Sequence, residues 1–114
     1  MNAKFNVWLE EDGNVIISLW RIRLLAAIGE TGSISSAAAQ LDVPYRIAWQ
    51  RLNEMETRLG RQLVVTQTGG RDGGGSQLTP LAQAYIAQFQ LVSQEINTLL
   101  QTHLSTLIAP PPTA

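Results

Sequence analysis

A chain of 114 residues has room for one domain with or without an extension, because single cores typically organise about 100–150 residues, and two independent domains are excluded. Hydrophobic residues make up 45% and charged residues 15%, which excludes disorder and predicts a buried core. The absence of cysteine and the single histidine, His103, argue against a disulfide framework, a metal site or an enzyme, and the net charge of −1 by itself argues against nucleic-acid binding. We therefore expect no catalytic residue, no metal and no cofactor.

The first third of the chain predicts a hairpin followed by a helix. Residues 4–9 alternate apolar and polar side chains as a strand does, 11–14 have turn chemistry, and 15–17 can form a short returning strand. Ser18 can cap a helix that ends at Thr31–Gly32. No apolar run approaches the roughly 20 residues of a membrane span and no signal peptide is present, so we expect a cytoplasmic protein without a membrane partner.

The middle of the chain predicts two helices joined by a tight turn. An alanine run behind a capping serine favours a short helix from about Ser35 to Leu41. Pro44 then suits the first turn of a longer helix that stops at Gly60. The apolar residues of this second helix repeat at helical spacing and should face the core. They are Ala48, Leu52, Met55 and Leu59.

The last third predicts a glycine-tipped hairpin and a long helix. Residues 62–66 and 77–79 read as strands around the tip 69–75, in which five of seven residues are glycine. Thr79 and Pro80 open a helix reaching about Leu107, roughly 40 Å long, which exceeds what so small a domain can cover. Its apolar stripe is typical of a coiled coil, although such stripes can also be plain core, and we expect it in a dimer interface. It consists of Tyr85, Phe89, Val92, Ile96 and Leu99.

This order of elements predicts a mainly α fold with a small β component, a winged helix-turn-helix. We expect a DNA-binding domain over 1–79, a dimerisation helix over 80–108 and a disordered proline-rich tail over 109–114. The outward stripe of the second helix in the motif offers arginine, amide and aromatic side chains of the kinds that read base edges. It consists of Tyr45, Arg46, Trp49, Gln50 and Asn53. Alternatively the stripe is only a solvated face, and Trp49 packs in the core under the N-terminal strand.

The charge balance differs along the chain. Between residues 46 and 71 five arginines face two glutamates, Glu54 and Glu56, a surplus of three that Asp72 reduces to two. The segment expected to touch DNA is therefore basic, and Arg71 can neutralise a phosphate from the glycine tip. The tip could instead be a linker or a phosphate-cradling loop, but it lacks the Gly-Lys-Ser/Thr ending of a nucleotide site.

The run from Gly32 to Leu59 resembles the helix-turn-helix of LysR-type and ModE-type bacterial regulators. The segment around Tyr45 and Trp49 and the glycine-rich run 68–75 followed by Leu78–Thr79 are closer to ModE, the molybdate-responsive type. The resemblance implies a homodimer on a pseudo-palindromic operator, with a link to molybdenum metabolism. ModE regulators usually carry C-terminal oxyanion-binding domains, for which 114 residues leave no room, so we expect no molybdate site. Pro44 replaces the serine-type residue common there.

The residues expected on double-stranded DNA lie in both helices of the motif and in the wing. They are Ser35, Ser36, Pro44, Tyr45, Arg46, Trp49, Gln50, Asn53, Arg71, Gly73 and Gly74. The main rival to this hypothesis is a winged-helix interaction module that modulates another regulator without binding DNA, and the net charge of −1 favours it. A salt-dependent gel shift distinguishes the two.

Overall fold

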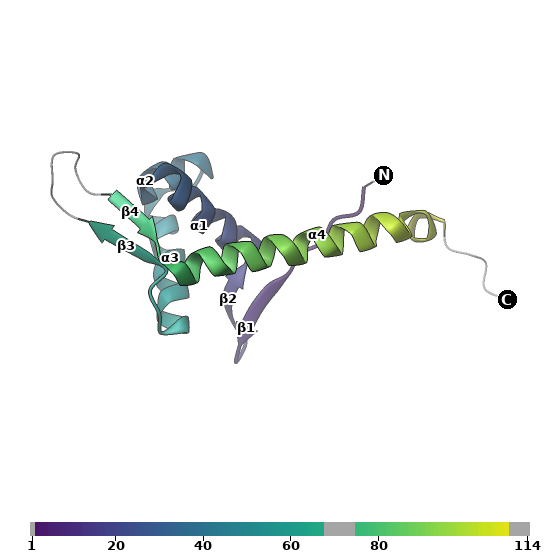
Figure 1. The fold of residues 1–114 in the computed structure, drawn as a ribbon, viewed down its shortest axis with the longest axis horizontal. Helices are drawn as coiled ribbons and strands as arrows, with labels where there is room; N and C mark the ends of the chain where they lie inside the picture. Colours follow the sequence, from purple (N-terminus) through teal and green to yellow (C-terminus); the bar gives the residue numbers. More distant parts are fainter. Residues whose placement is uncertain (1, 68–74, 110–114) are drawn as a thin grey trace.

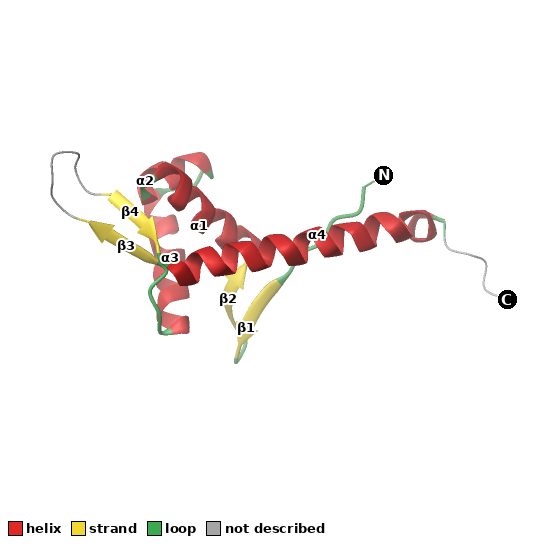
Figure 2. Ribbon diagram, viewed as in Figure 1, coloured by secondary structure: helices red, strands yellow, loops and turns green. Residues whose placement is uncertain are grey.

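The computed structural model describes residues 2–67 and 75–109. The fold is mainly α with two separate two-stranded antiparallel sheets (Figure 2), as the sequence predicts. The elements follow one another in the order shown in Figure 1. They are β1 (Trp8–Glu11), β2 (Asn14–Ser18), α1 (Leu19–Thr31), α2 (Ile34–Gln40), α3 (Tyr45–Leu59), β3 (Val64–Gln67), β4 (Gly75–Leu78) and α4 (Pro80–Ile108).

The first strand of the N-terminal hairpin begins and ends later in the chain than predicted, next to the turn. β1 pairs with β2 from Trp8 opposite Ser18 to Glu11 opposite Asn14, so the strand expected over 4–9 is wrong in its bounds. Phe5 and Val7 precede β1 and are half-buried, which explains their apolar alternation without a paired strand. The turn has two residues, Asp12 and Gly13, both with positive φ, and this geometry matches the twist of a tight hairpin.

Local capping sets the bounds of the three helices that build the helix-turn-helix. The Ser18 hydroxyl caps α1, and the Ser33 hydroxyl caps α2, which begins at Ile34, one residue earlier than predicted. The turn between α2 and α3 contains Asp42 with φ of 57°, a conformation that aspartate tolerates. Pro44 is the N-cap of α3, directly before its first turn, and Gly60 ends the helix with φ of 66°.

The core lies where α1, α2 and α3 meet β2 and the base of the wing. Its largest fully buried side chains come from these segments. They are Ile17, Leu24, Leu25, Ile28, Met55 and Leu63. Burial of each such side chain contributes about 1.5–3 kcal/mol relative to exposure, so the core holds the three helices in one arrangement.

A backbone hydrogen bond fixes the wing hairpin to the body: the N–H of Ser76 in β4 donates to the carbonyl oxygen of Gly32 at 2.8 Å. A second one, from the N–H of Thr79 to the carbonyl oxygen of Leu63 at 3.0 Å, closes the base of the hairpin. β3 and β4 pair from Val64 opposite Leu78 to Gln67 opposite Gly75. The predicted strands 62–66 and 77–79 are thus correct in place but displaced by about two residues toward the base of the hairpin.

The final helix leaves the body after its first three turns. Ala82 and Phe89 of α4 are buried, whereas Val92 and Leu99 are exposed. With 29 residues the helix is about 43 Å long, and it projects away from the body in the direction opposite to the wing (Figure 1). Of the predicted tail 109–114 only Ala109 is among the described residues, and no helix in 2–67 or 75–109 is apolar enough over sufficient length to cross a membrane.

Candidate nucleic-acid interface

The long helix α3 divides into a buried and an exposed side, as its spacing predicts. Ala48, Leu52 and Met55 are at most 5% exposed and pack in the core. Trp49 is 49% exposed and Tyr45 54%, so the alternative that places Trp49 in the core is wrong. Two exposed aromatic side chains on one stripe of a helix leave that stripe available to a large ligand. It also includes Arg46, Gln50 and Asn53, all exposed.

The N-terminus of α3 has free backbone donors. Pro44 caps it without a side-chain hydrogen bond, and the helix's own bonds from this end begin with the N–H of Ile47. The N–H groups of Tyr45 and Arg46 therefore point out of the helix with no capping side chain among the described residues, at the end where the helix dipole is positive. Such an end suits an anion, including a phosphate of a nucleic-acid backbone.

The other sequence-predicted contacts lie on α2 and in the wing. Ser35 and Ser36 are exposed in the first turn of α2, although the N–H of Ser36 is already bound by the Ser33 hydroxyl at 2.8 Å. Arg71, Gly73 and Gly74 lie outside the described residues. The structure therefore brings the serines and the α3 stripe into one helix-turn-helix, and the three tip residues remain predictions.

Glu56 holds the wing against α3, a role that charge counting does not reveal. Its Oε2 accepts the N–H of Leu63 at 2.8 Å and that of Val64 at 3.2 Å. Leu63 directly precedes β3 and Val64 is its first residue, so one carboxylate supplies the acceptor for the backbone N–H groups at the start of the strand. From the sequence alone Glu56 is only a negative charge near the expected DNA face.

Glu54 forms ion pairs with three arginines. Two of them, Arg51 and Arg58, contribute to the positive charge expected near DNA. Arg21 of α1 donates through Nη2 to Oε2 at 2.8 Å, Arg51 donates through Nη1 to Oε1 at 2.8 Å, and Arg58 Nη1 lies 3.8 Å from Oε2. Arg58 also donates to the carbonyl oxygen of Val15 in β2. The segment's surplus of three positive charges already subtracts Glu54 and is unchanged, but two of its arginines, Arg51 and Arg58, have partners within the protein.

The cluster also fixes the ionisation of Glu54. Burial raises the pKa of its carboxyl, but the Arg21 hydrogen bond and the positive charges of Arg21, Arg51 and Arg58 outweigh it, so the pKa lies below the ordinary 4.5. Glu54 is consequently a carboxylate at neutral pH. Arg21 was missed as a partner because 33 residues separate it from Glu54, whereas the i,i+3 spacing of Arg51 and Glu54 is a signal that the sequence does contain.

The apolar stripe of α4 divides into a covered part and an exposed part. Phe89 is only 7% exposed and belongs to the core of its own chain, and Tyr85 is partly buried beside it. Val92 and Leu99 are 40% and 59% exposed, with Ile96 partly exposed between them. Of the five residues expected in a dimer interface, Phe89 is therefore buried in the core of its own chain. The surface available to a second copy lies further along α4.

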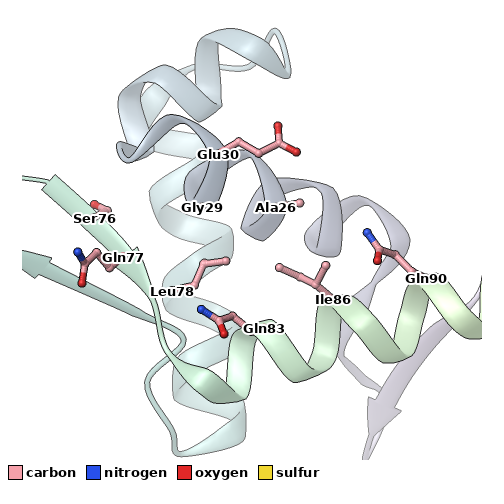
Figure 3. A pocket seen from close by; sticks show the side chains of 9 residues that line it. All are labelled: Ala26, Gly29, Glu30, Ser76, Gln77, Leu78, Gln83, Ile86 and Gln90. Atoms are coloured by element: carbon pink, nitrogen blue, oxygen red, sulfur yellow. The ribbon is translucent and has the colours of Figure 1, made fainter.

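A hollow of about 490 Å³ between α1, β4 and α4 lies apart from the α3 stripe (Figure 3). Leu78 and Ile86 point into it, amide side chains line its α4 edge, and Glu30 is its one carboxylate. A Cβ on Gly29 would lie 2.6 Å from Cδ1 of Leu78, so the glycine permits β4 to approach α1 closely. The hollow contains none of the residues expected on DNA and reflects how the wing and α4 pack on α1.

Comparison with known proteins agrees with this geometry. Residues 19–83, more than half of the chain, match the family described as bacterial regulatory helix-turn-helix protein, lysR family. The chain belongs to this family. The match covers α1, the helix-turn-helix, the wing and the first residues of α4. These proteins are regulators rather than enzymes, which confirms the expectation that the chain is not an enzyme.

Curated relatives are named for molybdenum and regulation. The chain is 38% identical over 87 residues to the molybdenum-pterin-binding protein MopB of Rhodobacter capsulatus, covering 76% of this chain and 32% of that protein. It is 40% identical over 94 residues to the DNA-binding transcriptional dual regulator ModE of Escherichia coli K12, covering 82% and 36%. The predicted resemblance to ModE-type regulators is confirmed, and the chain spans about a third of the length of the curated relatives it matches.

Solved structures share the fold at low sequence identity. The CbnR_DBD–DNA complex aligns with a TM-score of 0.61 and 18% identity over 80% of this chain and 99% of that one. The BenM_DBD complex with benA site 1 DNA aligns with a TM-score of 0.60 and 18% identity over 83% and 100%. The winged helix-turn-helix predicted from the sequence is thereby confirmed as the fold.

Proposed function

We propose that the chain binds double-stranded DNA sequence-specifically as a homodimer and regulates transcription. The observation that carries the proposal is the exposed stripe of α3, in which Arg46, Gln50 and Asn53 lie beside the half-exposed Trp49. Arginine pairs with guanine and amides pair with adenine in the major groove, while an aromatic edge packs on thymine methyl groups. The free N–H groups at the start of α3 supply a phosphate contact next to these side chains.

The remaining residues expected on DNA complete the proposed interface. Ser35 and Ser36 on α2 would face the sugar-phosphate backbone of the DNA, and Arg71, Gly73 and Gly74 of the wing would approach the flanking phosphates. The relatives named as DNA-binding regulators and the solved DNA complexes of the same fold support this placement.

The homodimer is proposed from the exposed half of α4. Val92, Ile96 and Leu99 form a stripe that stays partly or largely exposed in the described chain, and it continues the stripe that Phe89 begins in the core. A second copy that covers this stripe places two α3 helices on one DNA face, which suits a pseudo-palindromic operator. The link to molybdenum metabolism is proposed from the names of the relatives alone, and we assign no molybdate site to this chain.

The test is a gel shift on sheared genomic DNA of the source at low and raised salt, followed by sequencing of the bound fragments. A shift that weakens with salt and enriches a two-fold symmetric sequence supports the proposal, because phosphate contacts give the salt dependence and base contacts the enrichment. If no shift appears at either salt concentration, the proposal is overturned and the interaction module is favoured. That alternative is supported by Trp49, whose exposed indole equally suits a protein partner.

A further inference from the structure

Glu54 lies beside the side chains proposed to read bases. It follows Gln50 by four residues on α3, and side chains at this spacing are neighbours on a helix surface. The Glu54 side chain is 30% exposed, so it sits at the border between the groove-facing stripe and the packing of α3 on α1. Anything that the carboxylate holds is therefore held at the edge of the candidate interface.

The carboxylate holds more positive charge than it can neutralise. Arg21 and Arg51 each donate at 2.8 Å, one to each carboxylate oxygen, and Arg58 lies within 3.8 Å. Arg21 has a 10% exposed side chain and is fixed further by a 3.4 Å bond from its Nη1 to the Arg51 carbonyl oxygen. The side chains of Arg51 and Arg58 are 37% and 33% exposed, so solvent and any ligand can still reach them.

A DNA phosphate and a carboxylate bind guanidinium groups through the same forked geometry. Arginines that bind phosphates raise affinity for every sequence, because these contacts carry no base information. We infer that Glu54 is a specificity-determining residue that does not itself touch DNA: it occupies the guanidinium group of Arg51 and so keeps it from the phosphates, whereas Arg58 is held mainly by the carbonyl oxygen of Val15. The inference rests on the proposed DNA binding and adds a residue that limits its sequence-independent part.

The experiment compares the full chain with Glu54→Gln on an operator selected from bound fragments and on a random duplex of equal length, over a salt series. Glutamine keeps one acceptor for Arg21 but loses the charge that holds Arg51, while Arg58 keeps its bond to the Val15 carbonyl oxygen. We expect tighter binding to the random duplex, a salt slope steeper by about one, since each phosphate contributes about 0.9, and a specificity ratio about tenfold lower. Unchanged slope and ratio in a folded variant overturn the inference.

Two further variants separate this role from general charge and from folding. Glu95→Gln removes the same charge from exposed α4 and should leave slope and ratio unchanged; an equal effect there overturns the inference. Arg51→Gln tests it without altering Glu54. If Glu54 occupies Arg51 the salt slope stays that of the wild type, whereas a slope flatter by about one shows that Arg51 already binds a phosphate and overturns it. A wild type that binds neither duplex instead refutes the proposed function.

Discussion

The carboxylate of Glu56 accepts the backbone N–H of Leu63 at 2.8 Å, and through this bond the last turn of α3 determines where the wing begins. The same oxygen accepts the N–H of Val64 at 3.2 Å. Leu63 is fully buried and Val64 nearly so, which means that neither donor can turn to water instead. The two elements expected on DNA are thus connected by one side chain.

Replacing Glu56 should lower the free energy of unfolding, and more so when the new side chain offers no acceptor for the N–H groups of Leu63 and Val64. Glu56→Ala leaves two buried donors without a partner, at about 1–3 kcal/mol each, whereas Glu56→Gln retains one acceptor oxygen and should cost less. Urea unfolding monitored by circular dichroism gives both values. Equal stability of the alanine variant and the wild type would show that the wing is held by other contacts.

Trp49 and Leu52 lie three residues apart on α3, about 60° apart around its axis, yet Trp49 is 49% exposed and Leu52 only 5%. Trp49→Ala should change stability by no more than about 0.5 kcal/mol because the indole is half exposed, while Leu52→Ala should cost about 2–5 kcal/mol because it opens a cavity. DNA binding should weaken in Trp49→Ala at unchanged stability. A large loss of stability in that variant would contradict its placement on the binding face.

Arg46 and Gln50 should contribute to sequence discrimination. Arg46→Ala or Gln50→Ala is expected to lose about 1–3 kcal/mol at a selected operator and to relax the preference at one base position. Arg23→Ala is the matched control, since it removes the same charge from an exposed site of α1 beside α4. Fluorescence anisotropy on matched and substituted operators measures the difference; identical losses in Arg46→Ala and Arg23→Ala would reject base readout by Arg46.

Glu54 should make stability depend on pH in the acidic range. Because its pKa is lower in the folded chain than the ordinary 4.5, its contribution is complete above that value and is lost as the pH falls through the lowered pKa. Between about pH 5 and pH 2 the wild type should therefore lose more free energy of unfolding than Glu54→Gln does. Denaturant titrations at several pH values check this, and parallel curves for the two proteins would refute it.

The exposed stripe of α4 should determine the oligomeric state. Leu99→Glu places a charge on a side chain that is 59% exposed in one chain and is proposed to be buried between two. We expect sedimentation equilibrium to report a monomer for this variant and a dimer for the wild type. Thr98→Glu adds the same charge on a neighbouring exposed position off the stripe and should remain dimeric; dissociation of both variants, or of neither, would count against the stripe as the interface.

Helices could be predicted from the sequence because their signals are local. Ser18 and Thr79 each cap the start of a helix, and Gly60 ends one. The spacing of Ala48, Leu52 and Met55 alone identifies the buried side of α3. Strand bounds were less predictable, since they depend on a partner. Phe5 and Val7 alternate as strand residues do, but β2 ends at Ser18 opposite Trp8 and leaves them unpaired.

Only the part of the site that depends on which side of α3 is exposed could be predicted from the sequence. Spacing separates Trp49 and Gln50 from the core, yet it cannot show that Arg21 reaches Glu54 from 33 residues away. Counting charges along the segment treats Arg51 and Arg58 as free positive charge, although Arg51 pairs with Glu54 on its own helix and Arg58 donates to Val15 of β2. The discrepancy arises because a guanidinium group is satisfied by geometry in three dimensions and not by net charge per segment.

The continuity of α4 from Pro80 to Ile108 makes the protein sensitive to the phase of its last helix as well as to its length. One residue inserted between Phe89 and Val92 would rotate everything beyond it by about 100°, and the exposed stripe would no longer continue from the core. Seven inserted residues would restore the direction to within about 20°. Tolerance to insertions in this region should therefore be periodic, returning every second turn.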